Sequence, residues 1–332
     1  MCKIDNGGTH VIVFYVDDLL ILASREEINV LREILVNKFR WITMEVQDSV
    51  SYLGMQINRW DNQFEISMEF FITRLLEPYT ILPIRQTPGT RTVYQVSQTS
   101  ATLNEAERKV FHTETAKLLF LAKRVRPDIL TVVSFLCTRV TRATVEDRKK
   151  LARVLSYLKG TTAQGLVIRP VNNLQLHAYV DAAFALHDDS KSHTGVVILL
   201  DRSVLYVASR KQKCVTKSPT EAELVGLTDN LGLIVLFHEF VSFLIGRKVA
   251  LPIAYQDSTS VVTLITKGGG VVRTKHLRVR MHLAKEQLEK KRLVVQHIKA
   301  EGMVADGASK PLEGEDYQQY RRVVQGMSST TG

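Results

Sequence analysis

The sequence predicts an α/β and α+β protein: a small α+β unit, a mainly helical region, and an α/β unit built on a mixed five-stranded sheet with helices. Two observations support this prediction. Short apolar runs typical of strands alternate with helical periodicity, and the second half has the order βββαβ, helical material, βα. A length of 332 residues with 45% hydrophobic content also leaves room for two or three packed units.

Composition narrows the classes of protein further. A net charge of +10 favours a polyanion such as nucleic acid as a partner, although the same excess occurs in soluble proteins without one. The cysteines Cys2, Cys137 and Cys214 are far apart and show no CxxC or CxxH spacing, so neither a disulfide framework nor a zinc site is expected. No apolar run approaches the roughly 18 residues of a spanning helix, and no membrane partner is expected.

The first unit begins with a hairpin. Residues 11–23 read VIVFYVDDLLILA, two β-rich apolar runs that meet at Asp17 and Asp18. This pattern predicts a buried hairpin whose polar tip brings both carboxylates together. Helical spacing follows over 25–39, and 51–60 has the pattern of another strand.

A mainly helical pattern extends over 69–160. A loop over 84–100 interrupts it, and a long basic helix is expected over 145–159, ended by Gly160. Four aromatic residues at helical spacings are expected in the core rather than as base-stacking platforms: Tyr79, Phe111, Phe120 and Tyr157.

The α/β unit begins at 174–181, where apolar and polar residues alternate and end in Asp181. Two more short strands follow it, so three antiparallel strands are predicted. The remaining expected elements are a helix after Ser218, a strand at 249–257, helices at 258–266 and 275–290, a strand at 292–298 and a final helix from Met303. The residues after Val324, QGMSSTTG, have the composition of a disordered tail.

Two carboxylates close strands of this unit. Asp181 ends the first strand and Asp257 ends the fourth. If these strands lie side by side in parallel, both side chains reach the carboxyl edge of the sheet, where open α/β sheets bind ligands. Phosphodiester hydrolysis with two metal ions needs several carboxylates at such a place.

A third carboxylate comes from SPTEAE. Ser218 is expected as the N-cap, Pro219 as the first helical residue and Glu221 as the reciprocal partner of a capping box. Helix capping gives no role to Glu223. Glu223 also falls closer than Glu221 to the apolar stripe that must face the sheet, and it is the candidate ligand.

Asp306, at the start of the last helical segment, is the fourth candidate. Each of the four carboxylates alone has an ordinary explanation as a turn former or a partner of a helix dipole. Their order along the expected elements favours a shared site.

Basic residues form two groups. Lys211, Lys213 and Lys217 precede the glutamate helix, and a second group contains Arg273, Lys275, Arg278 and Arg280. Either group could contact phosphates or form a solvated face. His276 could instead be a buried hydrogen-bonding histidine, and 268–270 is expected to be a flexible loop.

A series of colinear motifs now identifies a resemblance. The segment from Leu174 to Leu312 resembles the ribonuclease H domain of Ty1/copia-type retrotransposon polyproteins through AYVDAAFA, DDSKSHTGVVILL, SRKQKCVTKSPTEAEL, YQDSTS, RTKHLRVRMHL and VADGASKPL. Upstream, FYVDDLLILA resembles the palm motif of reverse transcriptase. SYLGMQI, RPDILTVVSFL and RKKLARVLSYLKGTTAQGL resemble the segments that lead to ribonuclease H. The resemblance therefore covers nearly the whole chain.

The resemblance implies four segments. These are a truncated reverse transcriptase palm with the YVDD motif at 1–64, a thumb/connection-like helical region at 65–170, a ribonuclease H-like domain at 171–315 and a C-terminal tail at 316–332. It also implies an intracellular location, in the cytoplasm or nucleus, with the rest of a retroelement polyprotein as a partner.

The resemblance also implies roles for individual residues. The four metal ligands, which hold two Mg²⁺ or Mn²⁺ ions, would be Asp181, Glu223, Asp257 and Asp306. Asp17 and Asp18 match the polymerase pair. An RNA–DNA hybrid would be the substrate, with RNA selected through its 2′-hydroxyls. Nucleic-acid contacts would come from Arg273, Lys275, His276 and Arg278.

Two departures limit the resemblance. The polymerase needs another metal-binding aspartate on a strand before YVDD, and Asp5 is too close to serve. Nucleotide addition by this chain alone is therefore not expected. Some ribonucleases H use a histidine in the loop before the last aspartate, whereas His297 lies in the predicted fifth strand, so we assign it no catalytic role.

The sequence leaves three hypotheses: a hybrid endonuclease, a noncatalytic nucleic-acid-binding remnant, or a fragment of a longer RNA-directed DNA polymerase.

Overall fold

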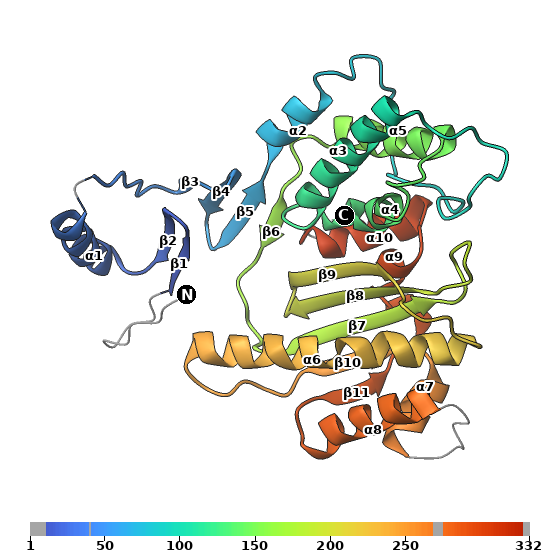
Figure 1. The fold of residues 1–332 in the computed structure, drawn as a ribbon. Helices are drawn as coiled ribbons and strands as arrows, with labels where there is room; N and C mark the ends of the chain where they lie inside the picture. The colour runs from blue at the N-terminus through green and yellow to red at the C-terminus, as the bar shows by residue number, and fades with distance from the viewer. Residues whose placement is uncertain (1–10, 40, 268–274, 328–332) are drawn as a thin grey trace.

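A computed structural model describes residues 11–39, 41–267 and 275–327 of the protein, without the side chain of His276. Its described strands form a two-stranded, a four-stranded and a five-stranded sheet (Figure 1). Arg273 and the expected flexible loop at 268–270 lie outside the described residues.

The expected N-terminal hairpin is present but not buried. Strands β1 (Val11–Tyr15) and β2 (Asp18–Leu22) pair antiparallel, and the capped helix α1 (Arg25–Lys38) follows. Phe14 is 61% exposed and Val16 82% exposed, so the expected burial is wrong. The hairpin is exposed because no other described strand pairs with it. Helix α1, which follows it, has no buried residues of its own.

The single strand expected at 51–60 is a second hairpin. Strands β3 (Ser49–Tyr52) and β4 (Met55–Trp60) turn at Leu53 and Gly54, both with positive φ. β5 (Gln63–Ser67) continues the sheet and pairs with β6 (Leu166–Ile168), which is distant in sequence. The segment boundary expected between residues 64 and 65 therefore falls inside a strand.

The mainly helical region is as predicted. Its elements are α2 (Glu69–Leu76), α3 (Glu105–Ala122), the short 3₁₀ helix η1 (Pro127–Ile129), α4 (Leu130–Cys137) and α5 (Val145–Lys159). Phe111 and Tyr157 are buried, and Tyr79 packs against the same core. The expectation for Phe120 is wrong, because its ring is 38% exposed and lies 3.6 Å from the Arg124 guanidinium.

The five-stranded sheet has the predicted mixed topology. Its strands are β7 (Leu176–Ala183), β8 (His193–Leu200), β9 (Ser203–Lys211), β10 (Ile253–Gln256) and β11 (Val294–His297). The order is β11-β10-β7-β8-β9. β7, β8 and β9 are antiparallel neighbours, whereas β10 runs parallel to both β7 and β11. The carboxyl ends of β7 and β10 consequently meet at one edge.

Both faces of this sheet are covered. Along β8 every residue is buried; Val197 and Leu199 belong to one hydrophobic core, and Val196 and Ile198 to another. This alternation arises because successive side chains of a strand point to opposite faces of the sheet. Figure 1 shows α6 (Pro219–Ile245) along one face and the helical region on the other. The helical region and the sheet therefore share a core.

The remaining helices are α7 (Thr259–Thr266), α8 (Lys275–Glu289), the 3₁₀ helix η2 (Ala300–Gly302), α9 (Asp306–Ser309) and α10 (Gly314–Val324). The final helix expected from Met303 is thus divided in two. The tail expected at 316–332 needs correction, since α10 buries Tyr317, Tyr320 and Val324 in the core shared with the helical region. Gln325 is also buried.

Helix α6 corrects another expectation. By length and composition it could cross a membrane, with a mean hydropathy of 1.5 in its most apolar window, although the sequence reading found no run of that length. In this structure 61% of that window is buried inside the protein. The buried helix of a protein core can be as long and as apolar as a membrane-spanning helix. Helix α6 packs along the five-stranded sheet in this way.

A buried ion pair ties the helical region to the C-terminal segment. Arg126 donates two hydrogen bonds to Asp128, at 2.9 and 2.8 Å, with both side chains fully buried. Tyr157 and Gln325 also donate to the Asp128 carboxylate. Burial opposes the ionised form, but the charge and hydrogen bonds of Arg126 hold the pKa of Asp128 below its ordinary value.

This ion pair gives a test of the fold. Arg126→Met leaves Asp128 charged and buried without its main partner, and we expect a loss of about 3–5 kcal/mol in the free energy of unfolding. The matched control is Arg148→Met, which breaks a pair with Glu107 between side chains 50% and 37% exposed and is expected to cost under about 1 kcal/mol. Urea denaturation measures both. Equal midpoints for the two variants would contradict the anchoring role.

Candidate metal centre

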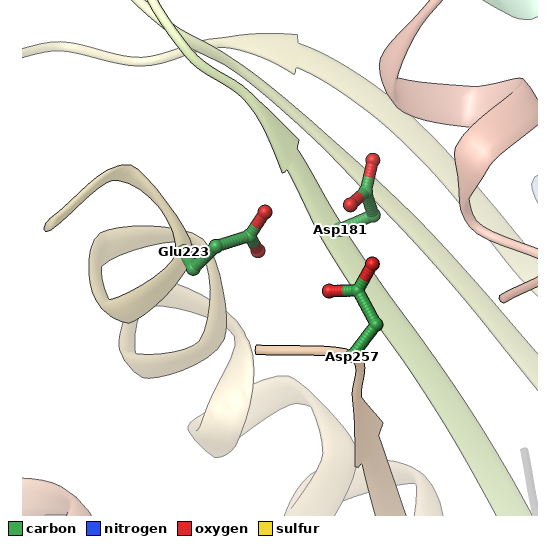
Figure 2. Close-up of side chains that lie close together, drawn as sticks. All are labelled: Asp181, Glu223 and Asp257. Atoms are coloured by element: carbon green, nitrogen blue, oxygen red, sulfur yellow. The ribbon is translucent and has the colours of Figure 1, made fainter. Parts of the chain in front are cut away.

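Three of the four predicted carboxylates converge at the edge where β7 and β10 end. Asp181 lies in β7 and is 4% exposed, Asp257 directly follows β10, and Glu223 lies near the start of α6. One oxygen from each side chain lies within 4.8 Å of the other two. Figure 2 shows the carboxylates facing one another from these elements.

The structure places Glu221 and Glu223 in different surroundings. Ser218 caps α6 by accepting from the Glu221 N–H at 3.2 Å, as expected. The reciprocal bond differs, because the Glu221 carboxylate accepts from the Lys217 N–H at 2.8 Å rather than from Ser218. Glu221 is thereby engaged at the helix start, whereas Glu223 faces the other carboxylates.

Glu223 occupies a buried and strongly acidic environment. Its Oε1 accepts from the Ala182 N–H at 3.2 Å, while its Oε2 is buried and has no hydrogen-bond partner among the described residues. Burial, followed by the charges of Asp181 and Asp257, raises the pKa of Glu223 to about 9. The pKa of Asp257 is also raised, by burial and by the charge of Asp306.

Asp306 lies beside this cluster rather than within it. As the first residue of α9, it forms an ion pair with Lys310 at 2.9 Å. Its pKa is raised by burial and by the Asp181 carboxylate, while Lys310 acts in the opposite direction. The structure therefore places the fourth predicted ligand next to Asp181 and ties it to a lysine.

The residues present fit a divalent cation. Hard cations such as Mg²⁺ and Mn²⁺ prefer oxygen ligands, and all four side chains are carboxylates. The buried Oε2 of Glu223 forms no hydrogen bond of good geometry with the described residues, although the Gln256 side chain lies near enough to lower the pKa of Glu223. A cation at this position would also relieve the repulsion that raises these pKa values.

Two residues around the centre were not singled out by sequence reasoning. Ser309 is fully buried, and its hydroxyl donates to Oδ2 of Asp181. Gln256 is also fully buried, and its Oε1 accepts from the N–H groups of Asp257 and Ser258 at 3.0 and 3.4 Å. Gln256 immediately precedes Asp257, and Ser309 belongs to VADGASKPL, but no local pattern indicates which atoms they contact.

The basic residues differ in their surroundings. Lys211 pairs with Asp189 at 2.8 Å, while Lys213 and Lys217 are exposed near the start of α6. In the second group Lys275 and Arg278 are exposed, as a phosphate contact requires. Arg280 instead pairs with Asp229.

The other candidate residues are Asp17, Asp18 and His297, and none of them contacts the side chains of the carboxylate cluster. Asp17 and Asp18 are exposed at the tip of the N-terminal hairpin, which Figure 1 shows well away from β7 and β10. His297 lies in β11, in the strand where it was predicted. Its Nε2 is 3.1 Å from the main-chain oxygen of Asp257 and so contacts the turn rather than the carboxylate.

Known proteins resemble most of this chain in sequence. No family model matches the chain. It is similar to the retrovirus-related Pol polyprotein from transposon RE1 of Arabidopsis thaliana, with 27% identity over 312 residues that cover 92% of this chain and 21% of the relative. It is also similar to that from transposon TNT 1-94 of Nicotiana tabacum, with 26% identity, 96% of this chain and 24% of the relative.

The homologues of this chain are thus Pol polyproteins of copia-type transposons, and the chain spans about a fifth of their length. Among solved structures, ribonuclease H1 from Halobacterium salinarum NRC-1 aligns with a TM-score of 0.32 and 16% identity, over 44% of this chain and 98% of that one. A foamy viral protease-reverse transcriptase in complex with RNA/DNA hybrid aligns with a TM-score of 0.48 and 16% identity, over 87% and 36%.

The raised pKa of Glu223 predicts that cation binding releases protons. With a pKa of about 9, Glu223 is mostly protonated at pH 7.5 in the cation-free protein, whereas a carboxylate ligand must be ionised. We therefore expect Mg²⁺ or Mn²⁺ affinity to rise from pH 6 toward pH 9, with roughly one proton released per site at pH 7.5. Calorimetry in two buffers with different ionisation enthalpies measures the release. Identical heats in both buffers would count against Glu223 as a ligand.

Proposed function

We propose that this chain is a retroelement-derived ribonuclease H that hydrolyses the RNA strand of RNA–DNA hybrids with divalent cations. The observation that carries the proposal is the convergence of Asp181, Glu223 and Asp257 at one sheet edge, with Asp306 beside them. The homologous Pol polyproteins support a retroelement origin.

Each carboxylate has a defined part in this proposal. Asp181, two residues before the end of β7, and Asp257, directly after β10, would hold cations from a rigid sheet. Glu223 would complete the set from α6. Asp306 would contribute to a second ion, with Lys310 as its partner until that ion binds. Two Mg²⁺ or Mn²⁺ ions would lower the pKa of an attacking water and neutralise the charge on the leaving ribose 3′ oxygen.

The proposed substrate follows from charge and chemistry. A net charge of +10 attracts a polyanion, and the exposed Lys213 and Lys217 lie just before the helix that carries Glu223. Phosphate contacts from this group and from Lys275 and Arg278 would position the hybrid. Contacts to 2′-hydroxyls would restrict cleavage to the RNA strand.

Nucleotide addition is not part of the proposal. Asp17 and Asp18 occupy a hairpin that pairs with no other described strand, and no further described carboxylate is grouped with them as a metal site.

The two neighbouring glutamates of α6 test the assignment. Glu223→Gln removes a charged ligand without changing the length of the side chain, and we expect Mg²⁺-dependent cleavage of hybrid RNA to fall by at least about 100-fold. The matched control Glu221→Gln changes a residue of the same type two positions away, whose carboxylate accepts from Lys217, and is expected to retain most of the activity. Initial rates on a hybrid with a labelled RNA strand measure both.

Equal losses in the two variants would contradict the assignment of Glu223. Salt-sensitive binding of the hybrid by the unaltered protein, with no cleavage in Mg²⁺ or Mn²⁺, would overturn the enzymatic proposal. That result would favour the nucleic-acid-binding remnant instead.

A further inference from the structure

Helix α9 lies against the five-stranded sheet at the position of Asp181. In the β7–β8 ladder Asp181 is paired with Gly195. A Cβ added to Gly195 would lie 2.5 Å from both the Ala305 carbonyl oxygen and the Ser309 nitrogen. Glycine at this position therefore lets the backbone of α9 approach the sheet closely, which places Ser309 beside Asp181.

The same short helix is fixed on its other side. Thr131 of α4 donates to the Gly307 carbonyl at 2.5 Å, and the Tyr320 ring of α10 packs against Gly307. A helix of four residues has little stability of its own. Its position therefore depends on the sheet, the helical region and α10 together.

Ser309 connects helix α9 to the Asp181 carboxylate. Its side chain is fully buried, and its hydroxyl donates to Oδ2 of Asp181 while lying 3.1 Å from the Asp306 carbonyl oxygen. The terminal torsion of an aspartate is broad, so the carboxylate plane is poorly fixed without such a bond. Holding Oδ2 on the α9 side fixes the direction of Oδ1 as well.

We propose that Ser309 is a positioning residue that orients the Asp181 carboxylate for a divalent cation. The inference rests on the proposed function, because it assumes that Asp181 is a ligand. Hydrogen bonds to ligating carboxylates of this kind set both their orientation and their affinity for metal.

The chemistry of the hydroxyl suits this role. It stabilises the ionised carboxylate through a hydrogen bond but adds no positive charge to compete with a cation. Lys310, one residue later, does carry a charge; it forms an ion pair with Asp306, and its charge also acts on Asp181 and Asp257.

The test is the affinity for Mn²⁺ of the full chain, measured by electron paramagnetic resonance titration without nucleic acid. Ser309→Ala removes only the hydroxyl, and we expect Mn²⁺ to bind about tenfold more weakly. Ser309→Thr keeps a hydroxyl and is expected to restore most of the affinity. Thermal melting establishes that each variant is folded; if the threonine does not fit, the alanine variant decides alone.

A matched control separates positioning from packing. Ser156 is also a buried serine, but its hydroxyl donates at 2.8 Å to the Ala152 carbonyl within its own helix. Ser156→Ala is expected to bind Mn²⁺ as the unaltered protein does. Unchanged Mn²⁺ affinity in Ser309→Ala would overturn the inference and leave the proposed function standing. Failure of the unaltered protein to bind Mn²⁺ would overturn both.

Discussion

The structure of this protein depends on the parallel pairing of β7 with β10, which places Asp181 and Asp257 at the same edge of a sheet buried on both faces. Carboxylates at this edge repel one another, and burial strengthens the repulsion because water screens it poorly there. Burial itself, followed by this repulsion, raises the pKa values of Glu223, Asp257 and Asp306. A rigid sheet can hold such a cluster, and a divalent cation would remove most of its cost.

Much of this arrangement could be predicted from the sequence because its causes are local. Alternating apolar residues predicted the strands, and the order of the elements predicted which strand ends meet. Capping logic separated Glu221 from Glu223 and correctly predicted Ser218 as the N-cap, although the Glu221 carboxylate accepts from the Lys217 N–H and does not complete the capping box. The family resemblance agreed with these local arguments, and the relatives found by comparison are of the same kind.

The features that sequence reasoning missed depend on contacts between distant residues. The apolar hairpin that carries Asp17 and Asp18 was expected to be buried, but no described strand covers it. The expected tail is instead partly helix α10, held by Tyr317 and Tyr320 in a core that residues far upstream provide. Ser309 contacts Asp181 across 128 positions of sequence, and no local pattern carries that information. Asp306 pairs with Lys310 and lies beside the three clustered carboxylates.

The helical region and α10 are therefore part of the environment of the metal centre. They fix α9, and α9 carries both Asp306 and the hydroxyl that holds Asp181. The most direct measurement of the central claim is cleavage of an RNA–DNA hybrid with each strand labelled in turn, comparing the unaltered protein with Asp181→Asn. The account predicts Mg²⁺-dependent shortening of the RNA strand alone, stopped by a chelator and absent in the variant. Cleavage that persists in Asp181→Asn, or that continues without a divalent cation, would contradict it.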